Sequence, residues 1–157
     1  MITLKNKINF QKKLFIRSIF TGFFGGILFY LAMLFLLAFN FVDKQFFPEI
    51  LLTKGFMKQL MNFLIIIILS SIHATIYHLI FKKILNLWFS VSYGIVLFLL
   101  LFSINLFVEK LKISINDSTS LITLLSLFIF YGVFISYSIS FDYYETIQRT
   151  RINQSST

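Results

Sequence analysis

The side chains that could do chemistry in this sequence gather in one apolar stretch, residues 60–81. Four of them form a candidate intramembrane polar site: Asn62, Ser70, His73 and Tyr77. Ser70, His73 and Tyr77 fall on one stripe of a helix, because residues three and four apart share a face. An imidazole among hydroxyls can relay protons or contact a polar ligand.

A second interpretation of His73 is structural. A neutral imidazole can hydrogen-bond to a neighbouring hydroxyl and do nothing else. The sequence favours this interpretation, because no Asp or Glu lies in any of the long apolar stretches. His78, beside Lys82, is expected at the membrane interface, and its five-residue distance from His73 makes the two a poor metal pair.

The sequence lacks the motifs of common enzyme classes. It has no Gly-x-Ser-x-Gly nucleophile elbow, no His-Glu-x-x-His zinc motif and no phosphate-binding loop. It has no cysteine, which excludes disulfides, thiolate metal sites and cysteine nucleophiles. We therefore expect no catalytic residue, no cofactor and no metal.

The elements that must position these side chains are membrane-spanning helices. Of the 157 residues, 58% are hydrophobic and 13% charged, too few polar residues to cover a soluble domain. Four apolar stretches are free of Asp, Glu, Lys and Arg, and each approaches the roughly 20 residues that a bilayer helix needs: 18–42, 60–81, 87–108 and 119–141. The predicted fold class is all-α, a single polytopic membrane domain (1–157) with four transmembrane helices in an antiparallel bundle.

The flanking segments are short. Residues 1–17 form a basic lead-in that is partly amphipathic, and the polar tail 145–157 is expected to fray. The turn at 82–86 is short enough to make the second and third spans antiparallel neighbours. Segment 43–59 is rather apolar and carries Pro48, which predicts a short interfacial helix between the first two spans.

The positions of Lys and Arg predict the orientation. The N-terminal lead-in, the 82–86 turn and the tail together carry nine of them, against five in the other two connections. The positive-inside rule therefore places both termini in the cytoplasm. The net charge of +8 lies beside apolar stretches and forms no separate domain, so we expect contact with the lipid bilayer and no nucleic acid.

Small residues recur at helical spacing in the first and last spans. They are candidate helix-packing positions, because small side chains let two membrane helices approach closely. We expect the two strips to face each other in a seam, or to face lipid or a second copy of the chain. The strips consist of Ser18, Gly22, Gly25 and Gly26 in the first span and Gly132, Ser136 and Ser140 in the last.

Several motifs resemble the YqhR-type integral membrane proteins of Gram-positive bacilli. They are Thr21-Gly22-Phe23-Phe24-Gly25-Gly26, Asn40-Phe41, Tyr93-Gly94 and the run from Tyr131 to Tyr143, YGVFISYSISFDY. The resemblance covers nearly the whole chain and implies a four-span plasma-membrane protein. It implies no site residues.

Two functions are compatible with these features. The favoured one is a non-enzymatic membrane protein that acts through contacts with lipids, with a membrane-protein partner or with further copies of itself. The alternative is a component of a small-molecule or ion transporter or channel, using the polar face of span 60–81 opposite Ser103 or Asn105.

Overall fold

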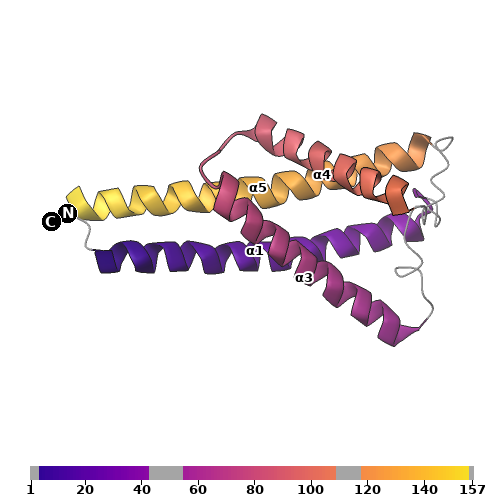
Figure 1. Ribbon diagram of the computed structural model, residues 1–157, viewed down its shortest axis with the longest axis horizontal. Helices are drawn as coiled ribbons and strands as arrows, with labels where there is room; N and C mark the ends of the chain where they lie inside the picture. Colours follow the sequence, from indigo (N-terminus) through magenta and orange to yellow (C-terminus); the bar gives the residue numbers. More distant parts are fainter. Residues whose placement is uncertain (1–3, 43–54, 109–117, 156–157) are drawn as a thin grey trace.

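The computed structural model describes residues 4–42, 55–108 and 118–155. These residues form four α-helices and no strand, which confirms the all-α prediction for this part of the chain. The helices are α1 (Leu4–Ala38), α3 (Phe56–Phe81), α4 (Leu87–Val108) and α5 (Ser118–Ser155). The chain reverses direction along the long axis from each helix to the next, so α1 begins at the end of the molecule where α5 finishes (Figure 1).

Three of the helices are long and apolar enough to cross a membrane. Their candidate spans are Gln11–Ala38 in α1, Gln59–Phe81 in α3 and Ser118–Arg149 in α5. In α4 the corresponding apolar stretch, Leu87–Ser103, is shorter when only the described side chains are considered. The predicted interfacial helix falls mostly on residues 43–54, which lie outside the described residues, and from Phe56 onward the chain belongs to α3.

Local hydrogen bonds explain where two of the helices end or begin. After α1, Asn40 adopts a left-handed conformation (φ 54°), and the Phe41 N–H reaches back to the Leu36 carbonyl at 2.9 Å. This is the Schellman ending, in which asparagine is a tolerated substitute for glycine. Before α4, the Asn86 side chain accepts a hydrogen bond from the Trp88 N–H at 2.9 Å, as an N-cap does.

Two helices extend further than the sequence predicts. The lead-in is the first part of α1, and the tail expected to fray continues α5 to Ser155. Neither extension contains glycine or proline, so nothing breaks the helix where the apolar stretch stops. In α5 an ion pair between Arg149 and Glu145 (2.6 Å), one turn apart, supports the helix further.

The helices meet most extensively in two pairs, α1 with α3 and α4 with α5, and α5 also contacts α1 and α3. Buried side chains form two clusters, one around Tyr30 and Leu124 and one around Tyr77 and Ile135. Large apolar side chains such as Phe130 (76% exposed) cover the outside. An apolar exterior around polar contacts is typical of a protein whose solvent is lipid.

Candidate functional site

A chain of hydrogen bonds between side chains connects all four helices. His73 of α3 lies between two tyrosines: its Nε2 is 2.5 Å from the Tyr93 hydroxyl of α4, and its Nδ1 is 3.1 Å from the Tyr131 hydroxyl of α5. The Tyr131 hydroxyl is also 2.8 Å from Oγ of Ser70, which donates to the Gly22 carbonyl of α1 at 2.7 Å. We call these five residues the four-helix chain.

The direction of each hydrogen bond in the four-helix chain follows from its last acceptor. Ser70 donates its one hydroxyl hydrogen to the Gly22 carbonyl, so it accepts a hydrogen bond from the Tyr131 hydroxyl. Tyr131 then has no second hydrogen and accepts from Nδ1–H of a neutral His73. The remaining nitrogen, Nε2, accepts from the Tyr93 hydroxyl. Each hydroxyl group of the four-helix chain therefore donates one hydrogen bond.

This arrangement favours the structural interpretation of His73. A proton relay works by reversing each of its hydrogen bonds in turn, and the Gly22 carbonyl has no hydrogen to give back. The rings add further contact, since His73 stacks on Tyr93 at an interplanar angle of 6° and a centroid distance of 5.5 Å. The chain is therefore suited to holding four helices in register.

His78 takes part in a second polar contact near the end of α3. It is 2% exposed, and its Nδ1 is 2.7 Å from Oγ of Ser18, which donates to the Leu14 carbonyl at 3.0 Å. The Lys82 ammonium lies 3.4 Å from Nε2 and donates to the Gln11 amide at 3.1 Å. Ser18 of α1 and the neighbouring helix surface bury His78 within the protein, and its expected place at the membrane interface, beside Lys82, stays a prediction.

Lys82 lies in the turn beyond α3. Partial burial and, to a lesser degree, the charge of the neighbouring Lys83 lower the pKa of the Lys82 ammonium below its ordinary value. Its ammonium also lies 5.8 Å from the centre of the Tyr143 ring, so this turn is connected to α5.

The other predicted polar residues of α3 are also buried. Asn62 is 5% exposed and Tyr77 is completely buried, with its hydroxyl 3.4 Å from Oγ of Ser140 in α5. Ser70 and His73 are brought together by the four-helix chain, which Tyr77 does not join; its ring packs on Tyr93 at a centroid distance of 4.9 Å.

The predicted seam between the small-residue strips of the first and last spans is wrong. The α1 strip packs on α3: a Cβ added at Gly22 would lie 2.6 Å from Cα of Ser71, and one added at Gly26 would lie 2.8 Å from Cα of Ile67. Gly25 is the exception, since it faces Ile135 of α5. Several faces of α1 are suitable for packing, and the spacing within one helix does not specify its partner.

The α5 strip meets other helices. Gly132 lies against Gly94 of α4, and an added Cβ would be 2.5 Å from Cα of Gly94. Ser136 donates to the Gly132 carbonyl of its own helix at 2.6 Å, and Ser140 lies near the Tyr77 hydroxyl of α3. Gly22 and Gly26 therefore belong to an α1–α3 contact and Gly132 to an α4–α5 contact, whereas Gly25 faces α5 from α1 and Ser140 faces α3 from α5.

The sequence analysis missed the partner that α4 supplies to His73. Ser103 is exposed and donates to the Leu99 carbonyl of its own helix, and the side chain of Asn105 lies outside the described residues. Tyr93 takes the place expected for them. It appeared in the sequence as part of an apolar motif, although a tyrosine within a membrane stretch needs a partner for its hydroxyl.

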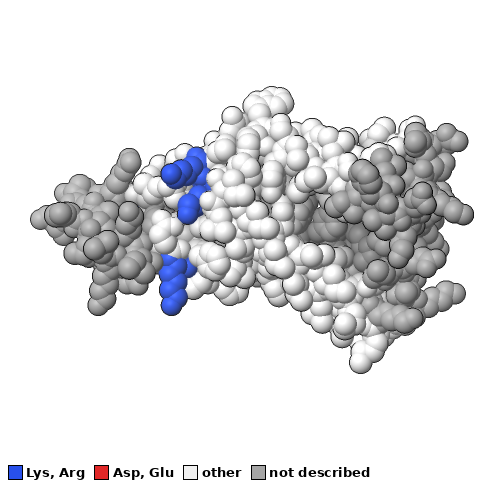
Figure 2. Space-filling model, in the orientation of Figure 1, with Lys and Arg blue, Asp and Glu red and all other residues white. Residues whose placement is uncertain are grey.

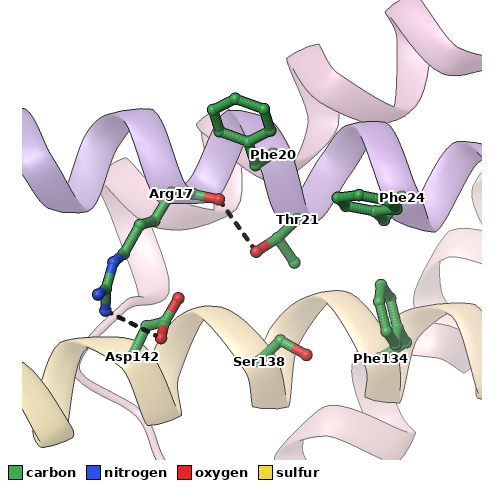
Figure 3. Close-up of a pocket in the computed structure, with 7 residues that line it drawn as sticks. All are labelled: Arg17, Phe20, Thr21, Phe24, Phe134, Ser138 and Asp142. Carbon is green, nitrogen blue, oxygen red and sulfur yellow. Dashed lines mark hydrogen bonds and ion pairs between the residues drawn. The ribbon is translucent and has the colours of Figure 1, made fainter.

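An open groove of about 310 Å³ lies between α1 and α5. Figure 3 shows Arg17 and Asp142 pointing toward each other at one end, Phe24 and Phe134 at the other, and Thr21 and Ser138 between them. The Arg17 guanidinium is 3.4 Å from the Asp142 carboxylate, and both side chains are about a third exposed (38% and 30%). We call this the α1–α5 groove.

Basic side chains gather toward the end of the molecule where this groove has its charged pair. Figure 2 shows Lys and Arg in one band toward the end where α1 begins and α5 finishes, and an uncharged surface between that band and the undescribed residues at the far end. The basic residues at this end whose side chains the structure describes are Lys12, Lys13, Arg17, Lys82, Lys83 and Arg149. We call them the basic band.

Known proteins resemble this chain along most of its length. The family model "Conserved membrane protein YqhR" matches residues 3–154. The "Uncharacterized protein YqhR" of Bacillus subtilis (strain 168) is 29% identical over 135 residues, which cover 80% of this chain and 75% of that protein. No solved structure shows a significant match. The resemblance predicted from the sequence motifs is confirmed.

Proposed function

Because the chain belongs to the YqhR family of conserved membrane proteins, we propose that it is a four-span, non-enzymatic protein of a bacterial plasma membrane. It acts through contacts with lipids or with other membrane proteins, and both of its termini lie in the cytoplasm. The observation that carries the proposal is the four-helix chain, which uses the polar groups of the spans internally and leaves apolar side chains outside.

The lengths of the helices support four spans. In addition to the three candidate spans, α4 is 22 residues long, or about 33 Å at 1.5 Å per residue, close to the roughly 30 Å of a hydrocarbon core. The basic band supports the orientation, because Lys and Arg accumulate in the short connections on the cytoplasmic side of a membrane.

Labelling of single cysteines tests the topology, since the native chain has no cysteine. Gln11→Cys and Gln148→Cys replace exposed residues at the basic end, and Gln59→Cys and Ser118→Cys replace exposed residues at the opposite end. In intact cells, a membrane-impermeant maleimide should label only the second pair, and after lysis it should label all four. Labelling of the first pair in intact cells would contradict the proposed orientation and indicate the opposite one.

Flux measurements test the contact function against the alternative, a transporter or channel component that uses the polar face of α3. We expect vesicles that contain the purified protein to show no more proton or solute leak than empty vesicles. A leak that falls in His73→Leu or Asn62→Leu, with both variants still folded, would favour the transporter.

Site-specific photocrosslinking in native membranes tests the contacts directly. A photoreactive residue at Phe130, which is 76% exposed, should give discrete lipid or protein adducts. The matched control is the same residue at Ile135, which is completely buried in the same helix and should give intramolecular products only. Equal products from the two positions would contradict an outward-facing contact surface.

A further inference from the structure

The α1–α5 groove combines a charged end with apolar walls. Arg17 and Asp142 lie at the charged end, while Phe20, Phe24 and Phe134 contribute aromatic side chains to the lining (Figure 3). Thr21 turns its hydroxyl toward the Arg17 carbonyl at 3.1 Å, so this polar group is satisfied within α1. The groove therefore suits a ligand with a charged head and an apolar body.

Arg17 has hydrogen-bonding capacity to spare. A guanidinium carries five N–H donors, and its contact with Asp142 is a single one at 3.4 Å, the long limit of a hydrogen bond. A bidentate pair with a carboxylate would be about 2.7–2.9 Å long. Among the described residues Asp142 is its one ionic partner, so donors are left for a phosphate.

The charge around the groove indicates the sign of the ligand. The basic band lies toward the end of the molecule where the groove has its charged pair. Such clusters at the cytoplasmic surface attract anionic lipid head groups. Asp142 opposes this attraction, because its negative charge competes with a phosphate for Arg17.

We propose that the α1–α5 groove binds an anionic phospholipid, with the phosphate on Arg17 and part of one acyl chain against Phe24 and Phe134. The groove's volume of about 310 Å³ has room for roughly ten groups of water size, which is the scale of part of an acyl chain and not of a whole lipid. The proposal rests on the membrane placement proposed above, and it adds a specific lipid site to a general lipid contact.

Native mass spectrometry of the full-length protein tests this site. The purified chain is titrated with phosphatidylglycerol and, separately, with phosphatidylethanolamine carrying the same acyl chains. We expect one phosphatidylglycerol to be retained about tenfold more tightly than the zwitterionic lipid. Inorganic phosphate at millimolar concentration should not displace it, because phosphate lacks the apolar contacts. Equal retention of the two lipids, or displacement by phosphate, would overturn the proposal.

Two variants should shift the affinity in opposite directions. Arg17→Gln removes the guanidinium that binds the phosphate and should weaken lipid binding about tenfold. Asp142→Asn removes the competing carboxylate and should strengthen lipid binding. The matched control is Arg149→Gln, which removes the same charge from a side chain that is 72% exposed and paired with Glu145. If Arg17→Gln and Arg149→Gln had equal effects, the attraction would be general and the groove no site.

A third variant blocks the apolar part without altering charge. Ser138 lies between the two ends of the groove, and Ser138→Leu should fill it and abolish retention of the lipid (Figure 3). Cysteine labelling of each variant separates the two proposals. If the unmodified protein shows the expected labelling pattern but no preference for phosphatidylglycerol, the groove site alone is refuted, whereas a changed labelling pattern in the unmodified protein would refute the membrane placement itself.

Discussion

The α4–α5 contact and the α1–α5 contact show two ways in which membrane helices can meet. At the first, Gly94 and Gly132 lie directly opposite each other, and backbone touches backbone. At the second, Gly25 has no small residue opposite it, and the side chains of Phe134 and Ile135 fill the space. The first contact is closed, while the second leaves a groove of about 310 Å³.

The difference teaches that a small residue makes a close contact where the facing helix presents its backbone, and a looser one where it presents large side chains. The α1–α3 contact supports this conclusion, since Gly22 faces Ser71 and Ala74 and lets Ser70 reach its carbonyl. Packing in lipid gains little from the hydrophobic effect, so such close approach supplies much of the attraction between helices.

Of the variants that test this comparison, one at the closed α4–α5 contact should have the largest effect on stability. In Gly132→Ala the new Cβ would lie 2.5 Å from Cα of Gly94, and a backbone cannot move aside as a side chain can. We expect α4 and α5 to separate locally and the free energy of unfolding to fall by about 1–3 kcal/mol. Thermal unfolding in detergent measures the effect, and unchanged stability would show that the contact is looser than described.

A smaller effect should distinguish two adjacent glycines of α1. Gly26→Ala would place a Cβ 2.8 Å from Cα of Ile67, whereas in Gly25→Ala the nearest atom, at 2.6 Å, is the mobile end of the Ile135 side chain. We expect Gly26→Ala to lower the unfolding temperature and Gly25→Ala to leave it unchanged or raise it slightly, because alanine is the better helix former. The same assay applies, and a loss of stability in Gly25→Ala would mean that α1 and α5 are also closely packed.

The smallest effect should come from the four-helix chain. Tyr131→Phe removes the hydroxyl that connects His73 with Ser70, and hydrogen bonds between membrane helices contribute about 0.6 kcal/mol on average. The matched control is Tyr137→Phe in the same helix, because Tyr137 is 43% exposed. Denaturant unfolding of the two variants should separate them by about that amount, and equal stabilities would remove the chain from the interactions that hold the helices.

The positions of the helices along the chain could be predicted from the sequence. The stretch expected at 60–81 ends with α3 at Phe81, and the one at 87–108 coincides with α4. Long apolar stretches without charge predict membrane-spanning helices by themselves, and charged residues such as Lys82 and Glu109 mark where they end.

The partners of the helices could not be predicted in the same way. The strip of Gly22 and Gly26 indicates that some helix approaches α1, but the choice of α3 depends on Ser71 and Ala74 lying at the right height. The polar site was partly predicted. Ser70 and His73 share a stripe and take part in the four-helix chain, whereas Tyr93 was counted among the hydrophobic residues and was not predicted to join it. Its hydroxyl becomes informative only when α4 lies beside α3.

The extension of α1 and α5 past Arg17 and Asp142 has a mechanical consequence. Each helix continues for about four turns beyond that pair, roughly 20 Å, whereas the head-group layer of one leaflet is only about 6 Å thick. In the proposed orientation the ends of the two helices project side by side into the cytoplasm. A protein that bound these ends would therefore pull on the bundle from beyond the head-group layer, at the end where the α1–α5 groove has its charged pair.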